Sequence, residues 1–103
     1  MKSPAKALEL AVFAGDVVEI HRLPASGRVL LGRAPESDIR IDHPSVSRRH
    51  AQLRLDGSKV TIEDLGSANG TFVGSHQLEP SSHVTVAEGQ PIRFGDVEAR
   101  FFI

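Results

Sequence analysis

The chain of 103 residues contains no cysteine, and its 12 basic and 13 acidic residues leave a formal net charge of −1. The lack of cysteine excludes a disulfide scaffold, a thiol nucleophile and a cysteine-based zinc site. The near-neutral charge argues against a nucleic-acid or membrane-surface binder, which normally carries a basic surplus. No apolar run approaches the roughly 20 residues of a membrane span, and the N-terminal segment lacks the apolar region of a secretory signal. We therefore expect one cytoplasmic domain with one core.

Long helical stripes are also absent, and apolar residues alternate with polar ones along most of the chain. An alternation of period two indicates strands with one buried face. Turn signals such as Ala14-Gly15-Asp16 and Asp56-Gly57-Ser58 separate the alternating runs. Many short strands at close spacing predict an all-β sandwich or barrel. The expected strands are Leu8–Phe13, Val17–Leu23, Arg28–Gly32, Ile39–Ile41, Ala51–Leu55, Val60–Leu65, Thr71–Val73, His83–Val86, Pro91–Phe94 and Val97–Ile103, with a further short one around Gln77.

The two ends of the chain differ in character. Residues 1–7 are expected to form a flexible tail, and residues 8–103 the domain. The last expected strand finishes on the apolar residues Phe101, Phe102 and Ile103, with no polar tail. Because chain ends are usually frayed and polar unless they are tied down, we expect this segment to come from a longer multidomain protein, cut at a domain edge.

Three short segments stand just outside the alternating runs: Gly32-Arg33, Ser47-Arg48-Arg49-His50 and Asn69-Gly70-Thr71. Their positions predict that they lie on loops or at strand ends. Together they supply guanidiniums, a hydroxyl and a side-chain amide, which are groups that can hold a phosphate and the peptide beside it. A guanidinium anchored at a strand end also loses less freedom on binding than one on a loop, and its planar fork suits a phosphate.

In order and spacing, these three segments resemble the forkhead-associated (FHA) domain, a module that binds phosphothreonine peptides. The resemblance runs from about Val29 to the end of the chain. It implies an antiparallel β-sandwich of about eleven short strands. It also implies a recognition module in Ser/Thr-kinase signalling that has no catalytic residue, no metal and no cofactor.

The resemblance assigns a role to each segment. It implies that Arg33 and Ser47 hold the phosphate, that Arg48 assists them, and that Asn69 hydrogen-bonds the main chain of the bound peptide. Arg49 is expected to be solvated surface, because strand alternation turns it away from its neighbours. The residues expected to shape the loops are Gly32, His50 and Gly70.

One position departs from the family pattern. Family members often carry a threonine before the asparagine, and this chain has Ala68 there, which lowers the expected affinity. A preference for phosphothreonine over phosphoserine would rest on one methyl group, on the order of 1–3 kcal/mol. The residues expected to face ligand side chains are small and predict a permissive surface: Ser67, Ala68, Gly74 and Ser75.

The expected partner is a protein or peptide phosphorylated on threonine. The only threonines of the chain are Thr61, Thr71 and Thr85, all within or beside expected strands, so residues 1–7 offer no ligand of their own. The ligand is therefore expected in trans or from sequence beyond Ile103. We expect a monomer that contacts neither nucleic acid nor membrane.

Simpler interpretations of the same residues are also possible. Arg33 on its own is a surface arginine paired with Glu36 or Asp38, and Asn69-Gly70 on its own is a plain hairpin turn. A different class of function, a phosphate-independent structural interaction domain of the same fold, also fits the pattern.

Enzymatic interpretations fail. Gly27 and Gly32 have the spacing of a nucleotide-binding loop, but a strand lies between them and no helix follows. Ser47, His50 and Asp64 lack the nucleophile elbow of a hydrolase triad. The five histidines show no metal-ligand spacing.

Overall fold

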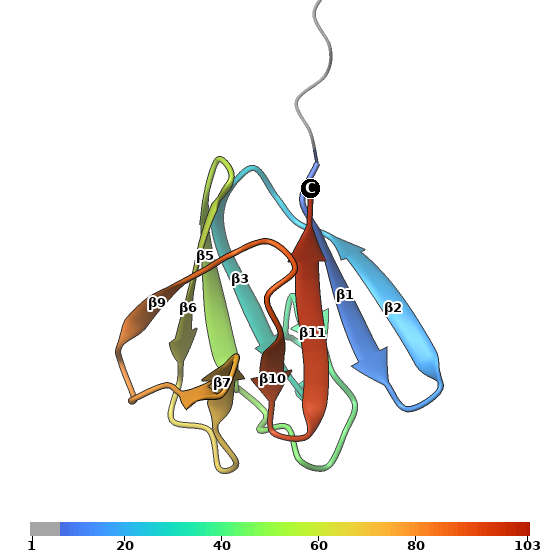
Figure 1. The fold of residues 1–103 in the computed structure, drawn as a ribbon. Helices are drawn as coiled ribbons and strands as arrows, with labels where there is room; N and C mark the ends of the chain where they lie inside the picture. Colours follow the sequence, from blue (N-terminus) through green and yellow to red (C-terminus); the bar gives the residue numbers. More distant parts are fainter. Residues whose placement is uncertain (1–6) are drawn as a thin grey trace, which may run out of the picture.

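The computed structural model describes residues 7–103, and this part of the chain contains eleven strands and no helix (Figure 1). It therefore holds no helix that is long and apolar enough to cross a membrane. The tail expected over residues 1–7 lies, apart from Ala7, outside the described residues. The strands are β1 (Glu9–Ala14), β2 (Val17–Arg22), β3 (Ser26–Gly32), β4 (Ile39–Arg40), β5 (Ala51–Asp56), β6 (Lys59–Asp64), β7 (Thr71–Val73), β8 (His76–Gln77), β9 (His83–Val86), β10 (Ile92–Phe94) and β11 (Val97–Phe102).

The strands form two sheets, in the orders β2-β1-β11-β10-β7-β8 and β4-β3-β5-β6-β9. The predicted all-β sandwich is confirmed, and strand ends differ from the expected ones by one or two residues. One pair was not expected: β4 runs parallel to β3, with Leu31 opposite Ile39. The chain turns back over residues 33–38 after β3, so β4 starts again in the same direction at the edge of the sheet.

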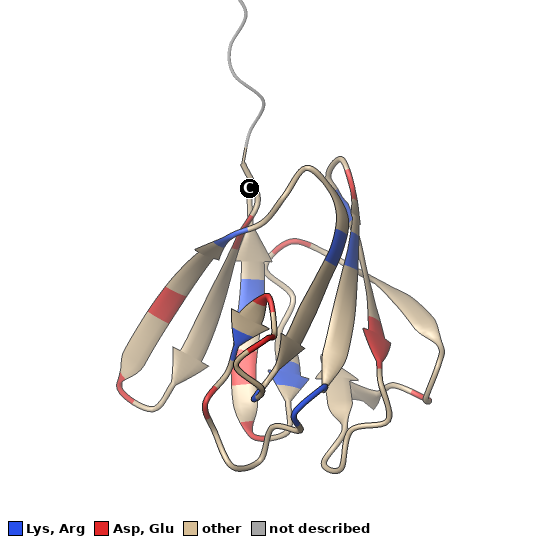
Figure 2. Ribbon diagram, turned by 180° about the vertical axis from the view of Figure 1, so that it is seen from behind, with Lys and Arg blue, Asp and Glu red and all other residues tan. Residues whose placement is uncertain are grey.

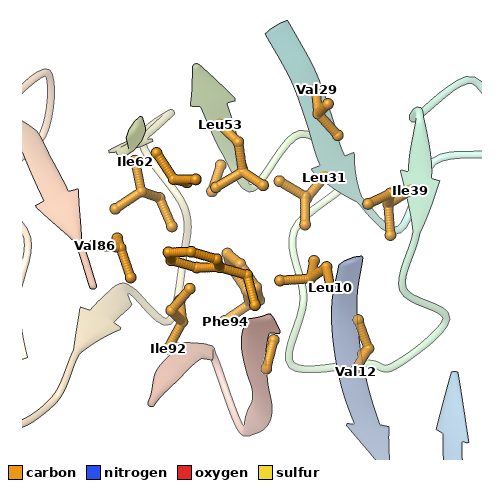
Figure 3. Close-up of a cluster of buried hydrophobic side chains, with 14 of the residues drawn as sticks. Leu10, Val12, Val29, Leu31, Ile39, Leu53, Ile62, Val86, Ile92 and Phe94 are labelled. Carbon is orange, nitrogen blue, oxygen red and sulfur yellow. The ribbon is translucent and has the colours of Figure 1, made fainter. Parts of the chain in front are cut away.

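The core lies between the two sheets, where alternate residues of facing strands meet (Figure 3). In β5 the burial alternates along the strand, with Ala51, Leu53 and Leu55 buried. Leu10 of β1 and Phe94 of β10 reach the same interior from the other sheet and are fully buried. Each buried side chain of this size contributes about 1.5–3 kcal/mol to the free energy of folding.

Four connections gather at one end of the sandwich, while the C-terminus leaves at the other end (Figure 1). They are the β3–β4 loop, the β4–β5 loop, the β6–β7 loop and the β10–β11 turn. Backbone hydrogen bonds join neighbouring connections: the Arg33 N–H donates to the Ser47 carbonyl (2.9 Å), and the Gly95 N–H donates to the Gly70 carbonyl (2.9 Å). The three sequence segments singled out above therefore meet at this end.

Candidate functional site

Arg33 follows directly on β3 and is half-buried at the loop end of the sandwich. Its Nε–H donates to the Val46 carbonyl at 3.0 Å, while its backbone N–H donates to the Ser47 carbonyl at 2.9 Å. The side chain is thus held at its Nε, and the two terminal nitrogens of the guanidinium keep their donors. A guanidinium fixed in this way is prepared for a bidentate contact with an oxyanion.

The carboxylates expected as alternative partners of Arg33 are engaged elsewhere. Glu36 pairs with Arg48 at 3.5 Å, and Asp38 accepts the Leu30 N–H at 2.7 Å. Among residues 7–103, no carboxylate forms an ion pair with Arg33. The interpretation of Arg33 as one half of a surface ion pair is therefore wrong.

Gly32 is buried where the β3–β4 loop passes the β4–β5 loop. A Cβ at this position would overlap the backbone carbonyl of Arg48, so no larger residue fits without moving that loop. The same carbonyl accepts the Ala34 N–H at 3.2 Å. Gly32 therefore permits the close approach that sets Arg33 beside Ser47.

The Ser47 hydroxyl accepts the Ala68 N–H at 2.9 Å, which joins the β4–β5 loop to the β6–β7 loop. A hydroxyl has one donor and two acceptor positions. Since this contact uses an acceptor position, the O–H of Ser47 keeps its proton for an incoming acceptor. Ser47 can both tie the loops together and donate to an anion.

Asn69 is exposed at the tip of the β6–β7 loop, and its Nδ2 donates to the Ser45 carbonyl at 2.8 Å. An amide group has two N–H donors and an oxygen acceptor, so one N–H and Oδ1 stay available. The next residue, Gly70, has a φ of 90°, in the region that favours glycine, and a Cβ there would overlap the Gln77 side chain. Asn69 is thus held on a sharply turned loop with groups that can pair with a peptide main chain.

His50 is fully buried and braces two of the loops from beneath. Its Nδ1 accepts the Ser47 N–H at 3.0 Å, so the ring proton of the neutral form lies on Nε2, which donates to the Gly70 carbonyl at 2.8 Å. The ring also meets Phe94 edge-on, with 5.8 Å between centroids. Burial lowers the pKa of His50 below the ordinary 6.5, against the opposing effects of the Gly70 hydrogen bond and the Asp64 charge.

This lowered pKa predicts a loss of stability in mild acid. Below pH 6.5 the unfolded chain binds a proton at His50 before the folded chain does, so the free energy of unfolding falls with pH until the folded pKa is passed. The slope contributed by this group is at most about 1.4 kcal/mol per pH unit. Urea unfolding between neutral and mildly acidic pH measures it. We expect His50→Gln to remove this part of the slope and the exposed His76→Gln to retain it; equal slopes in both variants would contradict the assignment.

Asp64 is a site residue that the sequence analysis missed, since it appeared there only in a rejected triad. It is buried at the end of β6, and its carboxylate accepts the backbone N–H groups of Gly66 (2.9 Å) and Ser67 (3.0 Å) and the hydroxyls of Ser67 and Thr71. Burial acts to raise its pKa, but these hydrogen bonds outweigh it and hold the pKa below 3.8. An aspartate two residues before a glycine is the local signal of such a turn.

Ser45 is a second site residue that the sequence did not reveal. It joins the β4–β5 loop, in which it lies, to the β10–β11 turn and to the β6–β7 loop. Its hydroxyl accepts the Asp96 N–H at 2.9 Å, and its carbonyl accepts the Asn69 amide. A Cβ on Gly95 would overlap the same carbonyl, so the β10–β11 turn packs directly against this loop. Nothing in the local sequence around Ser45 signals this contact, because both partners come from distant segments.

The remaining predicted residues lie in different places. Arg48 and Arg49 are exposed on the rim of the site, and Ala68 is exposed beside Asn69. The Ser67 hydroxyl is used within its own loop, where it donates to Asp64 and accepts the Gly70 N–H at 2.9 Å.

Gly74 and Ser75 are not brought to the same end. Gly74 donates its N–H to the Pro91 carbonyl before β10, whereas Gly70 meets Gly95 after it. Because β7 pairs with β10 along its whole length, Gly70 and Gly74, which flank the strand, lie about 13 Å apart at about 3.3 Å per residue. Ser75 follows Gly74 in the β7–β8 turn, at the end of β7 away from Asn69.

The chain is similar in sequence to known proteins. The family model described as the FHA domain matches residues 29–95. The glycogen accumulation regulator GarA of Mycolicibacterium smegmatis is 44% identical over 64 residues, which cover 62% of this chain and 39% of that protein. The chain thus spans about two fifths of the length of that curated relative.

Two solved structures share the whole architecture. The FHA domain of the CT664 protein from Chlamydia trachomatis superposes with a TM-score of 0.87 at 27% identity, covering 95% of this chain and 98% of that one. A domain solved in a study of phosphothreonine-dependent FHA interactions gives a TM-score of 0.83 at 28% identity, covering 95% and 97%.

Proposed function

Because the chain belongs to the FHA family, we propose that it recognises proteins phosphorylated on threonine and acts as a binding module rather than an enzyme. One observation carries the proposal: the Arg33 guanidinium is held at Nε by the Val46 carbonyl while its terminal nitrogens lack a carboxylate partner within residues 7–103. A guanidinium that is held in place with free N–H donors is prepared to bind an anionic ligand. The solved relative with phosphothreonine-dependent interactions supports phosphothreonine as that ligand.

In this proposal the phosphate lies between Arg33 and Ser47, whose backbones are hydrogen-bonded to each other. The terminal nitrogens of Arg33 donate to two phosphate oxygens, and the Ser47 O–H donates to a third. Arg48 adds positive charge from the rim once it leaves Glu36; this ion pair is exposed, so breaking it costs little. Asn69 pairs with the peptide main chain through Oδ1 and its remaining N–H.

The number of contacts sets the expected affinity. Hydrogen bonds to charged groups contribute about 1.5–3 kcal/mol each. Three or four of them, less the cost of ordering the peptide, give roughly 8 kcal/mol, which corresponds to a micromolar Kd. Such a module is suited to reversible signalling, with the ligand supplied by a Ser/Thr kinase.

The prediction that Ser67, Ala68, Gly74 and Ser75 face ligand side chains stays a prediction. The placement of Ala68 beside Asn69 supports a role near the phosphothreonine, and its methyl group leaves the surface open. For Ser67 we propose a positioning role, since its hydroxyl serves Asp64 and Gly70. Gly74 and Ser75 would contact only a ligand that extends past β7.

We also infer that the module serves a larger protein, because the match covers only 39% of the curated relative GarA. We place that protein in the cytoplasm, where Ser/Thr kinases act. Its ligand is another protein or a flanking segment of its own chain. No cofactor and no metal take part in binding.

The test compares three versions of one degenerate peptide library, carrying phosphothreonine, phosphoserine or threonine, by fluorescence polarisation. We expect micromolar binding of the phosphothreonine library and binding about tenfold weaker for phosphoserine, since one methyl group is worth on the order of 1–3 kcal/mol. The unphosphorylated library should not bind. Equal binding with and without phosphate would instead favour the phosphate-independent docking domain of the same fold.

A further inference from the structure

Strand β2 is open on three sides. Within residues 7–103 it forms one edge of the six-stranded sheet and pairs with β1 alone (Figure 1). Both of its faces are uncovered as well, since Val17, Val18 and Ile20 are 57%, 53% and 57% exposed. The strand has six residues and contains neither proline nor lysine, which most commonly protect an edge, and its charged residues are Glu19 and Arg22.

The other sheet edges are protected by their shortness. Strands β4 and β8 have two residues each, and β9 has four. A long edge strand that exposes apolar side chains offers a template for one more strand. The β2 edge is therefore the exception among the four edges of the described part of the chain.

The direction of the backbone groups of β2 follows from its pairing with β1. The Leu23 N–H donates to the Leu8 carbonyl, which makes these two residues a hydrogen-bonded pair. Hydrogen-bonded pairs alternate along an antiparallel ladder, so His21, Glu19 and Val17 also turn their backbone groups toward β1. The N–H and carbonyl groups of Val18, Ile20 and Arg22 then point to the open edge.

We propose that the β2 edge binds the same edge of a second copy of this chain, antiparallel and with Ile20 opposite Ile20 on a two-fold axis. Open backbone groups must face open ones, so even-numbered residues pair with even-numbered residues. The register centred on Ile20 satisfies this rule and sets Val18 opposite Arg22 of the second copy. It also places Glu19 opposite His21 on both sides of the axis.

Charge favours this register over the neighbouring one centred on Glu19. Centring the pair on Glu19 would set two carboxylates directly opposite each other, which destabilises a cross-strand pair. Figure 2 shows the single acidic position near the middle of β2 and the basic one at its end. On the outer face, Ile20 lies opposite Ala11 and Val18 opposite the partly exposed Phe13, so the apolar surfaces of two copies join into one.

The proposed dimer leaves peptide binding untouched. An antiparallel two-fold pairing points the loop ends of the two copies in opposite directions, so both candidate sites stay open. Dimer formation through β2 therefore does not depend on phosphopeptide binding. At low protein concentration the chain is the monomer that the sequence predicts.

Sedimentation equilibrium from about 10 µM to about 1 mM tests the association, since edge contacts of this size are weak. We expect the average mass to rise from 11.1 kDa toward twice that value. Ile20→Lys, which sets two lysines opposite each other, should abolish the rise. Phe102→Lys, on the same sheet but two strands away, should retain it. A constant mass in the wild type, or a rise that survives Ile20→Lys, would overturn the proposal.

The register has its own test, because the chain contains no cysteine. In the proposed dimer the Cα atoms of the two Ile20 residues lie about 5.5 Å apart, within the range of a disulfide. Ile20→Cys should therefore cross-link under mild oxidation much faster than Val18→Cys. Glu19→Lys should weaken the dimer, and Glu19→Lys with His21→Glu should restore it. Equal cross-linking at both positions, or no rescue, would contradict this register.

Discussion

Replacing Arg33 by alanine is expected to lower the affinity for a phosphothreonine peptide by about 100-fold or more. The substitution removes two hydrogen bonds between a cation and an anion, each worth about 1.5–3 kcal/mol, and about 1.4 kcal/mol corresponds to a tenfold change in Kd. The domain itself should stay folded, since the variant loses one hydrogen bond, to the Val46 carbonyl. Isothermal titration with one phosphopeptide, beside a urea melt of each protein, measures both quantities.

Two variants sharpen this result. Arg49→Ala removes an exposed arginine of the β4–β5 loop and should leave the Kd within about twofold of the wild type. Arg33→Lys keeps the charge but loses both the Nε contact and the planar fork. Its Kd should therefore lie between those of the wild type and of Arg33→Ala. If Arg33→Ala bound the peptide as tightly as Arg49→Ala did, the phosphate would lie elsewhere.

Replacing Asp64 by alanine is expected to lower the free energy of unfolding by about 3–5 kcal/mol, the range for breaking a buried hydrogen-bond network. The carboxylate accepts hydrogen bonds from Gly66, Ser67 and Thr71, and alanine leaves all of these donors without their partner. Since a typical domain is stable by about 5–15 kcal/mol, the loss is a large share of the total. Urea unfolding gives the value, and amide exchange at Gly66 and Ser67 should quicken.

Asp56→Ala is the matched control, because Asp56 is exposed at the end of β5. It should change stability by less than about 0.5 kcal/mol. Asp64→Asn keeps the shape of the side chain and one acceptor oxygen. Its free energy of unfolding should therefore lie between those of Asp64→Ala and Asp56→Ala. An Asp64→Ala variant as stable as Asp56→Ala would show that the β6–β7 loop is held by other contacts. The lowered pKa of Asp64 also predicts the direction of the pH dependence of stability. The stabilisation by Asp64 is present above pH 3.8 and is lost as the pH falls below that value.

The strands and turns were predictable because their signals are local. Alternation of apolar and polar residues marks each strand, and a glycine or aspartate marks each turn, so neither signal needs a distant partner. The parallel β3–β4 pair was not predictable in this way. Which strands pair depends on how the chain crosses the sandwich, and the alternation along β4 is the same for either direction.

The candidate site likewise contains residues that the sequence reveals and residues that only the fold reveals. Arg33, Ser47 and Asn69 could be chosen because the order and spacing of their segments resemble the FHA pattern, and the structure brings them to one end of the sandwich. Asp64 and Ser45 were missed, because their importance comes from partners such as Thr71 and Asp96. Gly74 and Ser75 were expected to share one surface with Ser67 and Ala68, but β7 lies between the two pairs and separates them.

By itself, the sequence determined the all-β class, the positions of the strands and the residue types available to hold a phosphate. Only the tertiary structure decided that Arg33 is held at Nε with no carboxylate partner among residues 7–103, that burial lowers the pKa of His50, and that β2 lies at a sheet edge. The physical reason is that side-chain chemistry and strand alternation are properties of neighbouring residues. Hydrogen-bond partners, burial and open edges depend instead on segments that meet only after the two sheets have packed together.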